Sequence, residues 1–319
     1  MYNIIKKFWF FAGLLAVSAI IVGDTTGIAA DSGRWLRAHS GPDTVIFLIF
    51  LFSGLILDIR QIRMGLTDVA GILIAQFIIF IIAPLVGALL AMIPLDTGVK
   101  IGIFLVAVMP TTLSSGVVMT VAAGGNMAHA LVITILSNGL SVFTIPLTLS
   151  LLLKLVGETA DISIDKTAIM IKLGVLVIVP LCFGLLIKFY TGSVLNRFNS
   201  KLQMINQWLI LGMVWMAMSQ TRDALINSGG TMGVIVLLTA ALHGLLLISA
   251  ALSARFFRLG RGRRETLLFM GGQKTLTLSV ILQVSLFPSY ALALVVCVLH
   301  HIVHLMIDGY LVEKVKTEN

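Results

Sequence analysis

The sequence predicts an all-α polytopic membrane protein whose ten transmembrane helices form two inverted five-helix repeats. Three observations support this class: the composition, the number of apolar runs, and two interrupted runs at corresponding places in the two halves. Of the 319 residues, 58% are hydrophobic and only 11% are charged, whereas about 25% of the residues of a soluble domain are charged. The mean hydropathy is +1.06. The chain is therefore expected to lie in a lipid bilayer.

The charge and the cysteine content argue against other classes. The formal net charge is +8, but the basic residues are dispersed in short loops without interleaved aromatic residues, so we expect no nucleic-acid partner. Cys182 and Cys297 lie in apolar runs, which gives neither a disulfide framework nor metal-ligand spacing. We expect no organic cofactor and no bound metal, and the oligomeric state stays open, with a monomer as one option.

Ten apolar runs approach the length of about 20 residues that a bilayer-spanning helix needs. Segments that are charged or rich in Gly, Pro, Asn and Asp separate them. The runs cover residues 8–23, 44–58, 68–93, 98–122, 127–154, 167–189, 202–221, 230–256, 265–286 and 289–311. The first run follows two lysines, as in a signal peptide. We interpret it as a retained signal anchor, because the count needs it as a span.

The distribution of Lys and Arg orients these spans. With the N-terminus in the cytoplasm, fourteen basic residues lie in cytoplasmic segments, and six lie on the opposite side together with most of the loop acids. The densest basic group is "RFFRLGRGRRE" between the eighth and ninth runs. Because basic loops stay in the cytoplasm, both termini are predicted to be cytoplasmic, in the inner (plasma) membrane of a bacterium.

The two halves of the sequence resemble each other weakly, since "ALVITILSN" (130–138) matches "ALVVCVLHH" (293–301). Each copy follows an interrupted run. Five spans is an odd number, so the second half enters the membrane with the opposite polarity, which is the plan of many secondary transporters. We therefore place the two repeats at 1–157 and 166–319.

The two interruptions hold the polar residues that we expect to form the site. Pro110 lacks a backbone donor and precedes four hydroxyl residues in the fourth run, and two glycines weaken the ninth helix by about 1 kcal/mol each. The polar members of the two breaks are Thr111, Thr112, Ser114, Ser115, Gln273, Lys274 and Thr275. A charged side chain at the bilayer centre costs roughly 2.5 to 3.5 kcal/mol or more. Lys274 is therefore expected to face a cavity or a binding partner.

Three motifs carry a family resemblance: "APLVGALLA" after "AQF", "MPTTLSSGVVMTVAAGGNMAHALVITILSN", and "GGQKTLTLSV". Together they resemble the bile acid:sodium symporter family, and within it the branch typified by solute carrier family 10 member 7 and its bacterial relatives. The resemblance implies a core domain of about 67–154 plus 228–312 and a panel domain of about 8–60 plus 166–226. It also implies that the broken fourth and ninth helices cross and that substrate binds between the domains.

The resemblance leaves the coupling ion open between Na+ and H+. The residues that match sodium-ligand positions of the family are Gln76, Ser115, Thr134 and Gln273. Gly116, Ala130 and Phe269, however, stand where sodium-coupled members supply oxygen ligands, and position 269 is that of the acidic residue which bridges both ions. Hard cations need oxygen ligands and usually a nearby formal charge, so sodium coupling is in doubt.

Lys274 replaces a neutral residue of the family motif, and three roles for it stay open. Its ammonium substitutes for a sodium ion among helix-end carbonyls, Gln76, Ser114 and Ser115; or it holds an anionic substrate beside half-helix N-termini; or it carries the coupling proton. We favour the first role. The predicted ion- and substrate-binding residues are Gln76, Thr112, Ser114, Ser115, Thr134, Gln273, Lys274 and Thr275, with Asn126, Asn138, His301 and His304 as further candidates.

A second polar group lies in the tenth run, where His300, His304 and Asp308 share one helix face with His301 beside them. This face is a polar packing surface, a proton relay or a set of transition-metal ligands, and packing is the default interpretation. His243 is isolated in the sequence and is interpreted as a hydrogen-bonded packing residue.

These features predict a secondary active transporter of a small organic anion that works by alternating access in the lipid bilayer. Two alternatives stay open. One is a regulatory membrane protein that transports nothing. The other is an intramembrane serine hydrolase that uses a serine of "TTLSSG" and a buried histidine. We do not expect an enzyme, because adjacent hydroxyls suit a ligand shell better than a single activated nucleophile.

Overall fold

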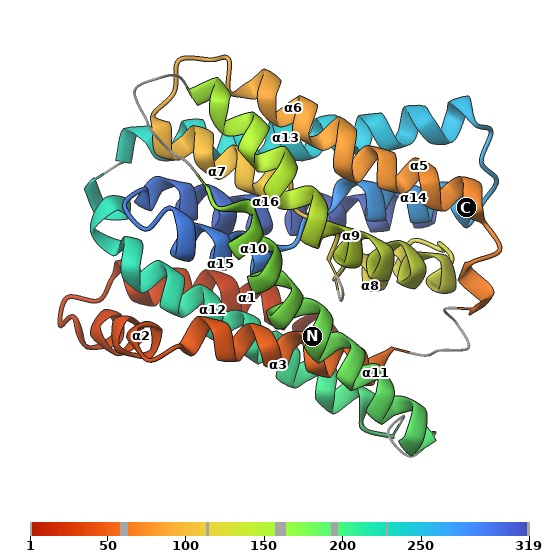
Figure 1. The fold of residues 1–319 in the computed structure, drawn as a ribbon, viewed down its shortest axis with the longest axis horizontal. Coiled ribbons are helices and arrows are strands. Elements are labelled where there is room, and N and C mark those ends of the chain that lie inside the picture. Colours follow the sequence, from red (N-terminus) through yellow and green to blue (C-terminus); the bar gives the residue numbers. More distant parts are fainter. Residues whose placement is uncertain are drawn as a thin grey trace.

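The computed structural model of the chain describes residues 2–57, 63–112, 115–156, 164–192, 197–227 and 229–317. Helices dominate these ranges, and no strand occurs in them (Figure 1). The elements are α1 (Tyr2–Val22), α2 (Ile28–Ala38), α3 (Gly41–Ile56), α5 (Val69–Phe77), η1 (Ile78–Ile82), α6 (Ala83–Leu90), α7 (Thr97–Ala107), α8 (Ser115–Ala122), α9 (Met127–Leu153), η2 (Lys154–Val156), α10 (Lys166–Leu173), η3 (Gly174–Ile178), α11 (Val179–Thr191), α12 (Asn199–Asn227), α13 (Gly229–Phe256), α14 (Arg263–Gly272), α15 (Leu276–Leu286) and α16 (Ala291–Thr317).

Within the described residues, six helical segments are long and apolar enough to cross a bilayer. They are Val69–Leu90, Met127–Leu153, Lys166–Thr191, Gly230–Phe256, Arg263–Leu286 and Ala291–Val315. A seventh is added if α2 and α3, which meet at a bend of 75°, count as one span. The chain is therefore a polytopic membrane protein. The count of ten spans in two inverted repeats stays a prediction.

The helices run roughly along one common direction, with α5, α6 and α13 at one edge of the view, α7, α14, α15 and α16 through the middle, and α1, α3 and α12 at the opposite edge (Figure 1). The C-terminus and the α13–α14 connection lie at one end of the bundle, and α2 and the α6–α7 connection lie at the other. We call these the C-terminal end and the α2 end.

α12 packs on both α1 and α3, and α3 packs on α11; we call these four helices the four-helix layer. α3 and α11 approach closely because each carries a glycine at the contact. A Cβ on Gly54 would lie 2.4 Å from the oxygen of Leu181, and one on Gly184 would lie 2.3 Å from the oxygen of Leu51. Small residues permit such close helix packing in membranes.

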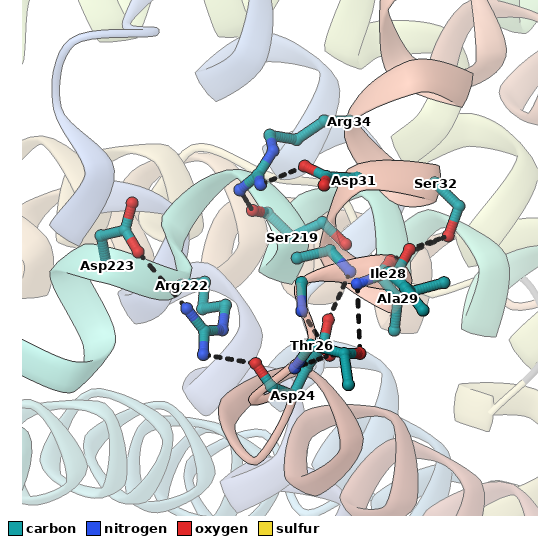
Figure 2. Close-up of polar contacts among 12 residues, drawn as sticks. Asp24, Thr26, Ile28, Ala29, Asp31, Ser32, Arg34, Ser219, Arg222 and Asp223 are labelled. Atoms are coloured by element: carbon teal, nitrogen blue, oxygen red, sulfur yellow. Dashed lines mark hydrogen bonds and ion pairs between the residues drawn. The ribbon is translucent and has the colours of Figure 1, made fainter.

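The short helix α2 was not among the predicted elements, and polar contacts explain why it forms. The Asp24 carboxylate accepts the N–H groups of Gly27 at 2.8 Å and Ala30 at 2.9 Å, so it satisfies amides at the start of α2. The hydrogen bond from Ala30, with others from Thr26 and Gly27, lowers the pKa of Asp24. Arg222 of α12 donates to the Asp24 carbonyl at 2.6 Å, which fixes the turn against α12 (Figure 2).

Candidate ion and substrate site

Two helices break at the predicted places, and the breaks contact each other. α7 ends at Ala107 and the chain resumes as α8 at Ser115, while α14 ends at Gly272 and α15 begins at Leu276. The Thr275 N–H donates to the Pro110 carbonyl at 2.9 Å. Backbone groups that the two helices no longer pair are thus satisfied across the crossing, as a lipid environment demands.

Lys274 lies in this crossing with its ammonium on three backbone oxygens. Nζ donates to the carbonyls of Ile79 at 2.9 Å, Ala107 at 3.1 Å and Met109 at 2.8 Å. The residue is 1% exposed. An ammonium has three donors, and the three carbonyls account for all of them. The predicted contact with helix-end carbonyls is therefore confirmed for Ala107 and Met109, whereas the three hydrogen bonds leave none for Ser115 or Gln76. Ser114 lies outside the described residues.

The Ile79 carbonyl is available to Lys274 because the third predicted span contains a π-helical turn. η1 spans Ile78–Ile82, and the Ala83 N–H donates to Ile78 instead of to Ile79. The next residue, Pro84, has no N–H and cannot replace that donor. Ala107 and Met109 lie at and beyond the end of α7, so their carbonyls also lack donors from a following turn.

The other predicted residues lie around the crossing with partners of their own. Gln76 donates to the Ile133 carbonyl at 3.1 Å, and its buried Oε1 has no partner among the residues that the structure describes. Thr134 donates within its helix to Ala130 at 2.8 Å. Asn138 donates to the carbonyls of Thr111 at 3.2 Å and Thr134 at 2.9 Å. Their predicted role as ion ligands stays a prediction.

Asn126 has a structural task in a different place. It is the N-cap of α9, where its side chain accepts the His129 N–H at 3.1 Å. Its own backbone N–H donates to the Thr266 hydroxyl at 2.8 Å. The contacts of Asn126 therefore stabilise the start of α9 and the neighbouring α14.

Gln273 joins the start of α8 to a buried carboxylate. Its Oε1 accepts hydrogen bonds from Thr112 at 2.7 Å and Ser115 at 3.1 Å. Its Nε2 donates to Asp308 Oδ2 at 2.7 Å. A Cβ at Gly116 would lie 3.1 Å from Gln273 Oε1, so a side chain there would crowd the amide that occupies this space.

A cluster of histidines surrounds Asp308. His243 of α13 lies 2.8 Å from Asp308 Oδ1 through Nε2, and both residues are fully buried. The structure thus confirms that His243 is buried and hydrogen-bonded, and it identifies Asp308 as the partner. The ring centroids of His300 and His304 lie 6.0 Å and 5.5 Å from that of His243. Within the described residues, no group of three or more His, Cys, Asp or Glu side chains is arranged to hold a metal ion.

A cavity of about 500 Å³ lies between the four-helix layer and the broken helices. One wall comes from α1, α3 and α12, and the other from α8, α15 and α16. Its polar lining residues are Ser53, Thr112, Ser115, Asn206, Gln207, Thr275, Thr277, His301, Tyr310 and Glu313. Lys274 is not among the lining residues, so its ammonium lies behind the crossing and outside the cavity.

The contacts of Asp308 and His243 were missed because nothing in the sequence relates α13 to α16. The recurrence of His300, His304 and Asp308 every four residues indicated one polar face. It did not indicate that Gln273 of the α14–α15 break and His243 of α13 would bond to Asp308.

Comparison with known proteins gives a consistent result. A family model described as the SBF-like CPA transporter family matches residues 8–317. The Arabidopsis thaliana protein named "Probable sodium/metabolite cotransporter BASS4, chloroplastic" is 27% identical over 281 residues, which cover 83% of this chain and 63% of the relative. "Sodium/bile acid cotransporter 7-A" of Xenopus laevis is 26% identical over 221 residues, which cover 68% of this chain and 63% of the relative.

A bacterial relative matches over a larger share of its length. "Uncharacterized protein PA2026" of Pseudomonas aeruginosa is 28% identical over 294 residues, which cover 86% of each chain. The chain thus spans less than two thirds of the length of the plant and frog relatives, and most of the bacterial one.

Proposed function

This chain belongs to the SBF-like CPA transporter family, of the bile acid:sodium symporter type that its motifs resemble, and from this premise we propose that it is a secondary active transporter of a small organic anion. Its relatives are named as cotransporters of metabolites or bile acids. The membrane-spanning helices supply the embedding that such a function needs.

The observation that carries the proposal is the placing of two helix starts beside the cavity. Ser115 begins α8, and Thr275 and Leu276 begin α15; all three line the cavity. Among the described residues, no side-chain hydrogen bond caps the N-terminus of α15. A helix N-terminus carries a partial positive charge and unpaired N–H groups, which together bind anions.

In this proposal the negative group of the anion meets backbone N–H groups and not a basic side chain. No Lys or Arg occurs among the described residues that line the cavity. The apolar lining, which includes Phe10, Phe50 and Leu305, suits a carbon skeleton. Glu313 is exposed at the C-terminal end of the cavity, away from the two helix starts that are proposed to bind the anion.

Contacts at the two ends of the bundle favour alternating access. The cavity extends from the crossing to Tyr310, which is 64% exposed near the C-terminal end. Toward the α2 end, Lys172 donates to Ser285 at 2.8 Å, and Arg37 donates to the Val284 carbonyl at 3.5 Å. One end is open and the other is bridged, as in a transporter that rocks between two states. We propose that the four-helix layer moves against the remaining helices, with both termini in the cytoplasm.

The role of Lys274 follows from its carbonyl ligands. The names of the relatives suggest Na+ as the coupling ion. We propose that in this chain the Lys274 ammonium takes the place of one such ion, since three backbone oxygens already surround it. Phe269 and Gly116, whose side chains supply no oxygen ligand for a sodium ion, agree with this role.

Ser115 is better suited to a binding site than to nucleophilic catalysis. Its hydroxyl is hydrogen-bonded to Gln273 and Thr112. An amide and a hydroxyl do not take up the proton of a serine nucleophile at neutral pH.

The test is ligand-induced stabilisation of the purified full-length protein across organic anions, cations and neutral metabolites. We expect at least one organic anion to raise the melting temperature and to be taken up by proteoliposomes. Thr275→Val and Ser115→Ala should weaken that stabilisation, while Ser249→Ala, whose serine bonds within α13 away from the cavity, should not. Stabilisation only by cations or neutral compounds, or stabilisation that both cavity variants keep, would contradict the proposal.

A further inference from the structure

The buried pair of Asp308 and His243 has hydrogen-bonding capacity that the transport proposal does not use. The Asp308 carboxylate is 0% exposed, with one oxygen on His243 and the other on Gln273. A carboxylate accepts and does not donate, so His243 Nε2 carries the hydrogen of this bond. That assignment leaves Nδ1 as the site with a free lone pair, and Nδ1 has no partner among the described residues.

Neighbouring rings connect this pair to the cavity. His301 lines the cavity and is 5% exposed. Its ring centroid is 4.6 Å from that of His304, and the His304 ring is 5.5 Å from that of His243. Within the part of the chain that the structure describes, both ring nitrogens of His301 and of His304 are buried without a hydrogen-bond partner. Unpaired buried polar atoms are costly, and a set of them in a row is unusual for residues that only pack.

The surrounding charges permit one additional proton. His300 and His304 of α16 lie next to the His243 ring, and His301 lies next to His304. The α14–α15 break supplies Lys274, which follows Gln273 in the sequence. Of the other helices packed on α13, α6 and η1 carry no charged residue and α7 carries Lys100. α14 carries Arg263, which bonds to Asp68, and Arg264, which bonds to Glu265. The Asp308 carboxylate is therefore the negative group that would balance an imidazolium at His243.

We propose that His243 and Asp308 form a proton-binding site, that His301 and His304 connect it to the cavity, and that substrate transport is coupled to its proton. This inference rests on the proposed transport function. One proton leaves water in the cavity and adds to Nδ1 of His243, which becomes an imidazolium paired with the Asp308 carboxylate. No other covalent bond changes, and the proton returns to water when the cycle is completed.

Gln273 links the proton to the anion. Its amide holds Asp308 on one side and the hydroxyls of Thr112 and Ser115 on the other. Thr112 in turn accepts the Gly116 N–H at 2.7 Å, at the start of α8. A change in the charge of the pair therefore acts through one side chain on the helix start that is proposed to bind the anion.

The test measures charge movement, which needs no substrate. Proteoliposomes of the full-length protein on a solid-supported membrane are exposed to a jump from about pH 8 to about pH 5.5, a range that titrates imidazole. Protons that move into the membrane interior give a transient current, whereas surface groups give little. We expect the current in the wild type, its loss in His243→Gln and Asp308→Asn, and its retention in His39→Gln, which alters an exposed histidine on α2's C-cap.

His243→Gln decides the outcome if Asp308→Asn fails to fold, because glutamine can still donate to the carboxylate. His301→Phe keeps an aromatic ring at the cavity and should slow the current without reducing the total charge. A wild-type current no larger than that of protein-free liposomes, a full current in folded His243→Gln, or an unchanged rate in His301→Phe would overturn the proposal. An anion that stabilises the protein while no His243-dependent current appears would leave the transport function standing and remove only this inference.

Discussion

Replacing Lys274 by alanine tests the crossing of the broken helices most directly. The substitution removes one buried ammonium and the three hydrogen bonds that it donates to Ile79, Ala107 and Met109. It leaves the backbone path of the crossing in place, since the Thr275 N–H still bonds to Pro110. Helix-end carbonyls then lie without donors in the protein interior.

The change in stability caused by Lys274→Ala is the sum of opposing contributions. Each buried acceptor left without a donor costs about 1–3 kcal/mol, so the three carbonyls set an upper limit of roughly 3–9 kcal/mol. Removal of the charge recovers several kcal/mol of desolvation, and water can enter the vacated polar space. We expect a net loss of about 1–3 kcal/mol, which is a fall in melting temperature of roughly 2–10 °C.

The assay compares melting temperatures of the purified variant in sodium and in choline buffers of equal ionic strength. Sodium should enter the space left by the ammonium, bind the three carbonyls and restore part of the loss, whereas choline is too large to do so. Lys201→Ala is the matched control, because it removes a lysine whose charge lies at the surface over the Phe198 ring. The control should show no dependence on the salt.

Two results would refute the reasoning about Lys274. Unchanged stability in both salts would mean that the three carbonyls do not depend on the ammonium. A loss of anion binding with unchanged stability would mean that Lys274 serves the substrate instead. Sodium-specific recovery in Lys201→Ala would show that the salt acts elsewhere on the protein.

Further predictions concern the unmodified protein, one ion pair and one helix contact. Sodium should not raise the melting temperature of the wild type, because Phe269 supplies no carboxylate. A sodium-specific rise in melting temperature that corresponds to about 2.7 kcal/mol of added stability at 100 times Kd would disprove this. Burial raises the pKa of Asp68, but hydrogen bonds from Arg263, at 2.6 Å each, and from a backbone N–H outweigh it and lower the pKa. Its contribution to stability should be full above about pH 4 and lost as the pH falls through the lowered value, so Asp68→Asn should melt earlier than the wild type at neutral pH and converge with it in acid. Gly184→Ala places a Cβ 2.3 Å from a backbone oxygen of α3 and should cost about 1–3 kcal/mol in thermal melts; Gly244→Ala, which meets nothing within 4 Å, should not.

The sequence located the breaks and the buried lysine because their causes are local. Pro110 and the pair Gly271 and Gly272 interrupt a helix by their own backbone chemistry. Lys274 also stands out by itself, because the free-energy cost of a charge within an apolar run is evident without knowing its partners. The family membership, which motifs also carry, was confirmed over residues 8–317.

Partners that come from distant helices could not be predicted. Helix-end carbonyls were predicted ligands of Lys274, but the Ile79 carbonyl was not, because it depends on a π-helical turn in another span. Likewise, no residue near His243 in the sequence indicated Asp308 as its partner. α2 was missed because it lies between the apolar runs from which helices were predicted. Its start is fixed by polar contacts of Asp24 with Ala30 and Arg222.

The π-helical turn before Pro84 has a consequence for protein engineering. One ligand of Lys274 is an oxygen that an imino acid has made permanently available. An alanine at position 84 restores a backbone N–H that can donate to the Ile79 carbonyl. This N–H then competes with the Lys274 ammonium for the same oxygen. Transplanting the lysine into a related transporter should therefore succeed only when the proline accompanies it, and double-mutant cycles of Pro84→Ala with Lys274→Ala should give a coupling energy different from zero.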